Sequence, residues 1–127
     1  MSKMYTRPLL TDLVLRLKEP RRFLQVLIGA RQTGKSTLAQ QAVDRLDLPS
    51  HVASADEPTL QSRSWIQEQW ELGRRRSRES GRRGGLLVLD EVQKVVGWSE
   101  TIKRLWDEDS YREIPLHVMA ALQLVIG

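Results

Sequence analysis

Residues 26–41 read VLIGARQTGKSTLAQQ, an apolar run followed by Gly29, four further residues and Gly34-Lys35-Ser36. Glycines at both ends of such a loop let the backbone curl until several N–H groups point inward. The helix that follows adds the positive end of its dipole at the same point. The stretch therefore predicts a phosphate-binding loop between a buried strand and a helix.

The spacing from Gly29 to Ser36 is that of a loop that holds nucleotide phosphates. Lys35 is expected to reach the β- and γ-phosphates as a point charge, and the Ser36 hydroxyl to complete the coordination of Mg²⁺. ATP and Mg²⁺ are therefore the predicted cofactors. The alternative, a glycine turn before a helix N-cap, does not require lysine before serine. The residues predicted to bind the cofactor are Gly29, Ala30, Arg31, Gln32, Thr33, Gly34, Lys35, Ser36 and Thr37.

A second apolar run, LLVLDE at residues 86–91, ends in two acids. Transfer of a phosphoryl group to water needs an acid that holds the metal and a group that orients the water. Asp90, with Ser36, is the predicted metal ligand. Glu91 is expected to point to the other side of the pleat and to polarise the attacking water. Glu91 and Lys35 are the predicted catalytic residues, and an ordinary solvated strand end is the alternative for the acidic pair.

Apolar spacing predicts strands that alternate with helices along the chain. Predicted helices cover residues 8–18, 35–46, 59–72 and 99–109, and predicted strands cover 22–29, 51–56, 86–91 and 116–126. This alternation is typical of an α/β fold with a mostly parallel sheet and helices on both faces. Such sheets bind ligands at the carboxyl ends of their strands, where both motifs fall.

Length and composition limit the class of protein. The chain has 127 residues and no cysteine, which fits one domain without a disulfide framework or a thiolate metal site. No stretch approaches the roughly 20 apolar residues of a membrane span. We therefore expect a soluble cytoplasmic protein with no membrane contact.

The basic residues are concentrated in one segment. The chain has a formal net charge of +4, whereas the stretch RRRSRESGRR at residues 74–83 alone holds six arginines and one glutamate, which is +5, so the remainder is near neutral at −1. The favoured interpretation is a solvated, mobile linker after the helix that ends near Leu72. Contact with nucleic acid is the alternative, because Trp65 and Trp70 precede the run and basic grooves bind single strands together with stacking aromatics.

The motifs together resemble a known family. IGARQTGKST and LLVLDEVQK, followed by GWSETIKRLWDE and IPLHVMA, are similar to the prokaryotic AAA-type ATPase domain that commonly precedes an uncharacterised C-terminal domain. The resemblance extends from about Tyr5 to Leu124. It implies a RecA-like, three-layer P-loop NTPase fold in which the strand at 116–121 lies between the loop strand and the Asp90 strand.

Two departures from the family pattern concern the end of the chain. Family members typically end the last of these strands in Gly-Ser-Ser, whose hydroxyl contacts the γ-phosphate or the attacking water, whereas this chain reads MAALQLVIG. Gln123 is the candidate substitute. The chain stops at Gly127, so we expect residues 1–127 to form a single, partial AAA-type core domain without the fifth strand, the lid or an arginine finger.

These observations lead to a principal hypothesis and two alternatives. The principal hypothesis is an ATP-binding domain that hydrolyses ATP with Mg²⁺. The alternatives are a truncated or degenerate nucleotide-binding or interaction module without turnover, and a small P-loop kinase. A homo-oligomer or a protein partner is compatible with each of them.

Other polar and aromatic residues have predicted roles outside the two motifs. Gln93, two residues after Glu91, is a candidate for relaying contact with the γ-phosphate to a partner surface. His51 and His117 are isolated in the sequence and are expected to be structural. Trp98 and Trp106 are expected to pack the helix after Glu91 onto the sheet.

Overall fold

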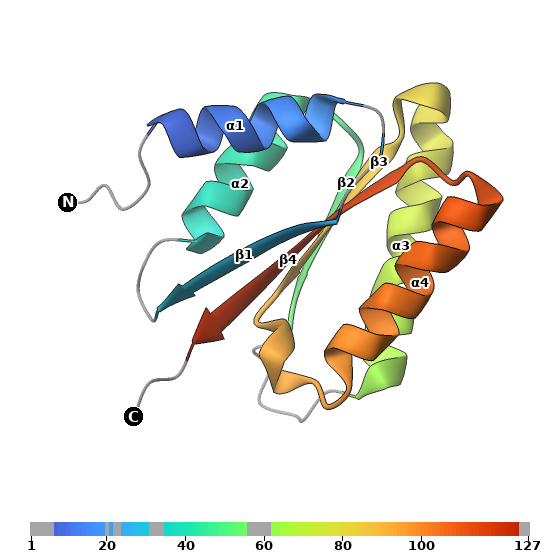
Figure 1. Cartoon of the computed structure of the whole chain (residues 1–127). Helices are drawn as coiled ribbons and strands as arrows, with labels where there is room; N and C mark the ends of the chain where they lie inside the picture. Colours follow the sequence, from blue (N-terminus) through green and yellow to red (C-terminus); the bar gives the residue numbers. More distant parts are fainter. Residues whose placement is uncertain (1–6, 20, 22–23, 31–34, 56–61, 125–127) are drawn as a thin grey trace.

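The computed structural model describes residues 7–19, 21, 24–30, 35–55 and 62–124. Its helices and strands alternate, as the apolar spacing predicts (Figure 1). In order they are α1 (Arg7–Lys18), β1 (Gln25–Ala30), α2 (Lys35–Leu46), β2 (Ser50–Ser54), α3 (Arg63–Ser80), β3 (Gly85–Asp90), α4 (Trp98–Arg112) and β4 (Leu116–Leu124). Two short 3-10 turns, η1 (Gly81–Arg83) and η2 (Val92–Lys94), flank β3.

The four strands form one parallel sheet in the order β1-β4-β3-β2. The last strand of the chain thus lies between β1 and β3, as the family resemblance implies. Helices α1 and α2 cover one face and α3 and α4 the other, so the domain has three layers (Figure 1). The prediction of an α/β fold with a P-loop NTPase arrangement is confirmed in the described residues.

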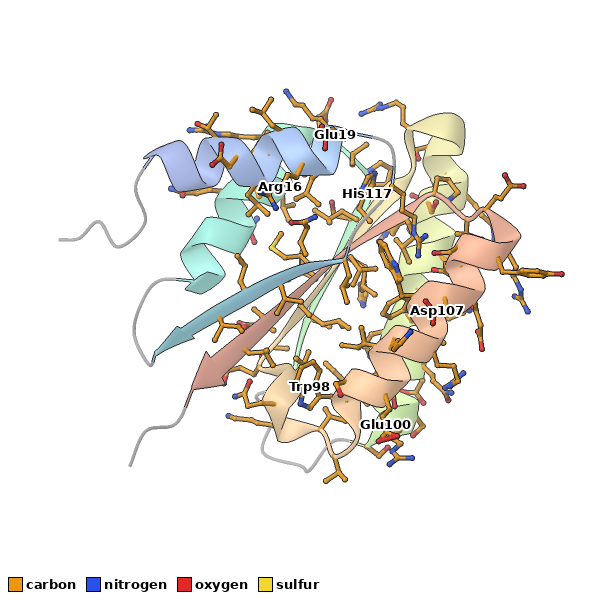
Figure 2. All side chains as sticks on the ribbon, in the orientation of Figure 1. Arg16, Glu19, Trp98, Glu100, Asp107 and His117 are labelled. Atoms are coloured by element: carbon orange, nitrogen blue, oxygen red, sulfur yellow. The ribbon has the colours of Figure 1, made fainter. Side chains whose placement is uncertain are left out.

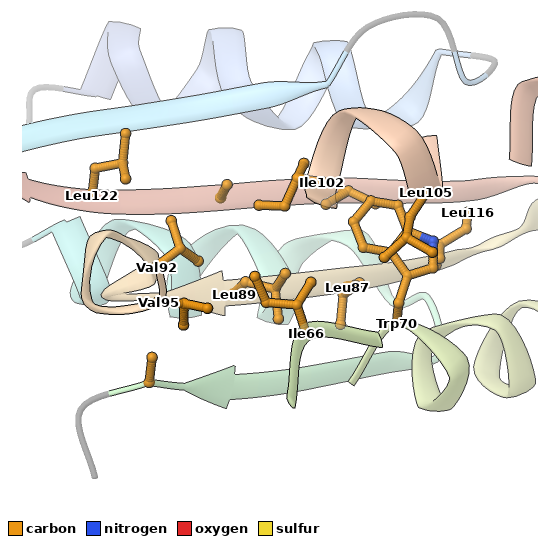
Figure 3. Packing of buried hydrophobic residues seen from close by; sticks show 13 residues of the cluster. Ile66, Trp70, Leu87, Leu89, Val92, Val95, Ile102, Leu105, Leu116 and Leu122 are labelled. Atoms are coloured by element: carbon orange, nitrogen blue, oxygen red, sulfur yellow. The ribbon is translucent and has the colours of Figure 1, made fainter. Parts of the chain in front are cut away.

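The two central strands are buried on both faces, which explains their unbroken apolar sequence. The four residues from Leu86 to Leu89 are each at most 1% exposed. Because side chains alternate along a strand, Leu86 and Val88 pack beneath α1 and α2, whereas Leu87 and Leu89 pack beneath α3 and α4. Figure 3 shows the second of these layers, with Trp70 of α3 against the sheet.

Helix α3 differs from the prediction at its C-terminal end. It was expected to end near Leu72 and to be followed by a mobile linker, but it continues to Ser80. The expectation of a linker is therefore wrong. The reason is a buried face at helical spacing, formed by Ile66, Trp70, Gly73 and Ser77, that continues into the arginine run. The predicted start at Thr59 lies outside the described residues.

Close packing of α3 on the sheet depends on Gly73. A side-chain carbon at this position would lie 3.1 Å from the Cβ of Leu87 and 3.4 Å from the Leu116 side chain. Glycine therefore lets the helix backbone approach β3 and β4 closely. Ser77, one turn further along, is also buried, and its hydroxyl donates a 3.1 Å hydrogen bond to the Pro115 carbonyl.

Other predicted boundaries differ by a few residues. Strand β3 ends at Asp90 rather than at Glu91, and α4 runs to Arg112 rather than to Asp109. Strand β4 extends to Leu124, and the remainder of its predicted range lies outside the described residues. None of the described helices is both long and apolar enough to cross a bilayer.

Asp109 joins α3 to α4 beneath their polar surfaces. Its carboxylate is completely buried and accepts hydrogen bonds from the Trp70 indole at 2.8 Å and from the Arg74 Nε at 2.8 Å. The Arg74 Nη2 lies 2.6 Å from the same carboxylate. Burial lowers the pKa of Arg74, but hydrogen bonding and charge attraction from Asp109 and Glu71 outweigh it, so the pKa is raised overall. The ion pair holds the start of the arginine run in the helix.

Replacement of Asp109 by alanine is expected to lower the free energy of unfolding by about 3–5 kcal/mol, because it leaves a largely buried Arg74 without its main partner. Equilibrium urea unfolding measures this change. Asp107→Ala on the exposed side of α4 (Figure 2) is the matched control. It should change stability by less than about 0.5 kcal/mol, since exposed pairs such as Asp107–Lys103 contribute little. Equal effects of the two substitutions would contradict this account.

His117 is buried near the start of β4, only 8% exposed. Its pKa is lowered from 6.5, first by burial and second by the nearby positive charge of Arg21. The unfolded chain therefore binds more protons than the folded chain at pH values just below 6.5. The contribution of His117 to the free energy of unfolding should therefore be complete above pH 6.5 and should be lost as the pH falls below 6.5.

His117→Gln is expected to remove this component of the acid sensitivity. The substitution replaces a titrating group by a neutral amide that gains no proton on unfolding. Urea midpoints measured at pH 7.5 and pH 5.5 should differ less for the variant than for the wild type. An unchanged difference between the two pH values would show that His117 does not cause it.

Candidate nucleotide-binding site

The two sequence motifs lie at one edge of the sheet. Strand β1 ends at Ala30 and α2 begins at Lys35, so the Gly29–Ser36 motif spans the junction between them. Strand β3 ends at Asp90. Because the strands are parallel, their carboxyl ends share this edge, which we call the motif edge (Figure 1).

Strand β4 separates the two motifs. It pairs with β1 as far as Ala30↔Leu124 and with β3 as far as Leu89↔Ala120. Two strand spacings place the ends of β1 and β3 about 10 Å apart across the sheet. Gln123, the candidate sensor, is in register with Gly29, although its side chain lies outside the described part of the structure. The two motifs therefore face the same edge on either side of the end of β4.

Only the backbone of the phosphate loop's two ends is described. Gly29 and Ala30 end β1, and Lys35, Ser36 and Thr37 form the first turn of α2. Their side chains and residues 31–34, which include Arg31, lie outside the described residues. What the structure does give is the predicted order of strand, loop and helix, with the helix N-terminus directed to the motif edge.

Asp90 is fixed by hydrogen bonds of the surrounding backbone. Its Oδ1 accepts a 2.9 Å hydrogen bond from the Glu91 N–H, and its carbonyl accepts one of 2.9 Å from the Ala55 N–H. In the register of β2 with β3, Asp90 lies opposite Ser54. The partly exposed carboxylate is therefore held at the motif edge, where a cation could reach it.

Glu91 is positioned by a turn and not by the strand. Its φ of 58° and ψ of 35° place it in the left-handed region, immediately before η2. The expectation that Glu91 extends the strand and points to the other side of its pleat is therefore wrong. The turn follows from packing, since Val92 and Val95 after it are at most 1% exposed and must reach the core beneath α4.

The Glu91 carboxylate is enclosed by neighbours from the same short segment. Glu91 is 6% exposed. The Gln93 Nε2 donates a 3.0 Å hydrogen bond to its Oε1, and the Lys94 Nζ lies 3.8 Å from the same oxygen. Buried carboxylates are stabilised by such charged and polar partners. Gln93 therefore orients Glu91. The sequence-based prediction gave Gln93 a role as a relay and did not include this hydrogen bond.

Sequence reasoning did not identify two residues of the motif edge. Lys94 could have been identified from its i, i+3 spacing to Glu91, but that signal becomes meaningful only after the 3-10 turn is known. Ser54 carries no motif and reaches the edge only because β2 pairs with β3. Within the described ranges no group of three or more His, Asp or Glu side chains is arranged to hold a metal. A cation here would thus need oxygen ligands beyond the described carboxylates.

The isolated residues have the structural roles expected of them. His51 on β2 is hydrogen-bonded to the Gln69 side chain of α3 at 2.7 Å. Trp98 and Trp106 are partly buried and pack α4 against the core, as predicted, and Figure 2 labels Trp98. Arg21 stacks on Trp106, with its guanidinium 3.5 Å from the ring centroid.

Comparison with solved structures supports the fold. The chain is similar to C. elegans PCH-2, with a TM-score of 0.57 and 14% sequence identity. The likeness covers 95% of this chain but only 39% of that protein. At this identity it shows the arrangement of helices and strands and nothing about the ligand. No relative was found among curated proteins.

Comparison with protein families gives a closer relationship. The profile of the AAA domain matches residues 21–121, which include both motifs and most of the sheet. The match covers most of the chain. The order of the strands in the structure agrees with it, because it is the P-loop NTPase arrangement. This chain belongs to the AAA domain family.

Proposed function

We propose that this domain binds ATP with Mg²⁺ at the motif edge and hydrolyses it. The observation that carries the proposal is that Asp90 and Glu91 follow β3 at the same edge as the junction of β1 and α2, with only β4 between the two strands. A triphosphate bound at that junction would direct its outer phosphate across the end of β4 toward the two acids. Membership of the AAA domain family supports nucleotide binding.

Each proposed ligand group has a chemical role. The loop from Gly29 to Thr37 would offer backbone N–H groups to the phosphates, and Lys35 would neutralise their charge. Ser36 and Asp90 supply oxygen ligands to Mg²⁺, which prefers hard oxygen donors and keeps several waters. Glu91, enclosed and oriented by Gln93, accepts the proton of the attacking water.

The second candidate is a module that binds nucleotide without turnover. A specific observation favours it: Glu91 is 6% exposed and its carboxylate contacts Gln93 and Lys94 of the same short segment, which leaves little room for an attacking water. The absence of a hydroxyl residue between Pro115 and Gly127 favours the same candidate.

The remaining parts of the proposal concern partners and location. We propose a homo-oligomer or a protein partner, in the cytoplasm, as the setting of the nucleotide cycle. The arginine run supports nucleic acid less well than its composition suggests. Within it, Arg74 pairs with Asp109, Arg76 with Glu79 and Arg78 with Glu71.

Lys35→Ala is expected to weaken the binding of MgATP by about 10- to 100-fold, the loss expected for one charged hydrogen-bonding group. Titration with a fluorescent ATP analogue measures the dissociation constant. Lys103→Ala, on the exposed side of α4, is the matched control and should bind as the wild type does. Equal affinities of the Lys35 variant and the wild type would overturn the proposal of a nucleotide site.

Glu91→Gln is expected to retain nucleotide binding but to lower steady-state phosphate release by about 100-fold or more, as for the loss of a general base. The amide preserves the size of the side chain and removes its ability to accept a proton. Phosphate release is measured with saturating MgATP. Equal, low rates for variant and wild type, with tight binding by both, would establish the module without turnover instead.

A further inference from the structure

A cavity of about 410 Å³ lies at the end of the sheet opposite the motif edge. It is lined by Leu17 and Leu46 near the C-terminal ends of α1 and α2, and by His117 near the start of β4. Since β4 runs from this cavity to the motif edge, the two places are separated by the length of the strand. None of the described residues of the two sequence motifs lines the cavity.

The inner wall of the cavity is apolar. Leu17 and Leu46 are almost completely buried, and Leu48 and Pro115 contribute further carbon surface. A volume of this size accommodates a small organic molecule. Burial of such a molecule against aliphatic side chains would be favourable by about 25 cal/mol for each Å² of apolar surface removed from water.

Arg21 is a rigid positive charge in the cavity wall. Its Nε donates to the Leu116 carbonyl at 2.7 Å, and its Nη2 donates to the Trp106 carbonyl at 2.8 Å. Its Nη1 donates to the Ser110 hydroxyl at 2.6 Å. These contacts use three of the five N–H groups of the guanidinium and fix its plane. The charge therefore acts on the cavity from a constant position.

His117 adds a neutral polar group to the same wall. Burial and the charge of Arg21 lower its pKa, so the imidazole is uncharged at neutral pH. A neutral imidazole offers one donor and one acceptor. Glu19, which follows α1, lines the same cavity as His117, and Figure 2 labels both residues at this end of the molecule.

The charged side chains around the cavity are mainly positive. Among the described residues that line it, Lys18, Arg21 and Arg83 are positive, and Glu19 carries a carboxylate. Lys18 and Arg83 are exposed, and Arg83 also donates to the Asp47 carbonyl after α2. The C-terminal ends of α1 and α2 carry a partial negative charge from their helix dipoles, which is smaller than the full positive charges of these side chains. The side chains therefore give the mouth of the cavity a net attraction for anions.

We propose that this cavity is a binding site for a small organic anion, with one acidic group on a compact apolar body. The acidic group would lie between Lys18 and Arg83, and the apolar body against Leu46 and Leu48. The site is separate from the motif edge. The proposal does not depend on nucleotide binding.

The test compares three probes with the same ring and different charges: benzoate, benzyl alcohol and benzylamine. His117 lines the cavity and His51 does not, so the two imidazole signals in the proton NMR spectrum of the full chain distinguish this site from others. The His51→Gln variant assigns the signals. We expect benzoate to shift the His117 signal with an affinity about fivefold higher than benzyl alcohol, the effect of one solvent-exposed ion pair. Benzylamine should bind most weakly.

Substitutions test whether the cations at the mouth cause the preference. The double variant Lys18→Gln, Arg83→Gln should reduce the affinity for benzoate to that for benzyl alcohol. Lys103→Gln, Arg104→Gln removes two equivalent charges from α4 and should have no effect. Inorganic phosphate should shift His117 less than benzoate, because it lacks the apolar body.

Three outcomes would overturn the proposal. Equal affinities for the three probes, or tighter binding of benzylamine, would show that the cavity does not select anions. A benzoate response at His51 but not at His117 would place the site elsewhere. A double variant that binds benzoate as the wild type does would show that Lys18 and Arg83 do not hold the acidic group.

Discussion

The insertion of β4 between β1 and β3 is the constraint on which the rest of the structure depends. Parallel pairing on both sides of β4 places the carboxyl ends of β1 and β3 at the same edge. Without it, the Gly29–Ser36 motif and the acidic pair at residues 90 and 91 would be unrelated features of the chain. The same strand begins at Leu116, and its second residue, His117, lines the cavity, so β4 also sets the distance between the two ends of the domain.

Burial of the central strands requires a helical layer on each face, and the two layers are stabilised differently. The layer of α1 and α2 rests on aliphatic contacts among residues such as Leu13, Leu17 and Leu46. The layer of α3 and α4 also contains a buried polar link between Trp70, Arg74 and Asp109. Directional hydrogen bonds fix the relative position of two helices more narrowly than apolar contacts do.

Strands and helices could be predicted because each leaves a local pattern in the sequence. The run from Leu86 to Leu89 has no polar residue, as a strand buried on both faces requires. The C-terminal half of α3 could not be predicted in this way. Its arginines are typical of a solvated segment until the buried partner of Arg74 is known, and that partner lies 35 residues further along the chain. Glu91 was misplaced for a related reason, since its left-handed turn is imposed by the burial of Val92 and Val95.

The sequence by itself determined the phosphate-loop spacing, the acidic pair and the alternation of strands and helices, because these depend on residues close together in the chain. Tertiary structure alone decided how Gln93 and Lys94 enclose Glu91, and that Lys18, Arg21 and Arg83 surround one cavity. The physical reason is that burial and ion pairing act between side chains that meet only after folding. Their partners are specified by the packing of the whole domain and not by spacing within any one segment.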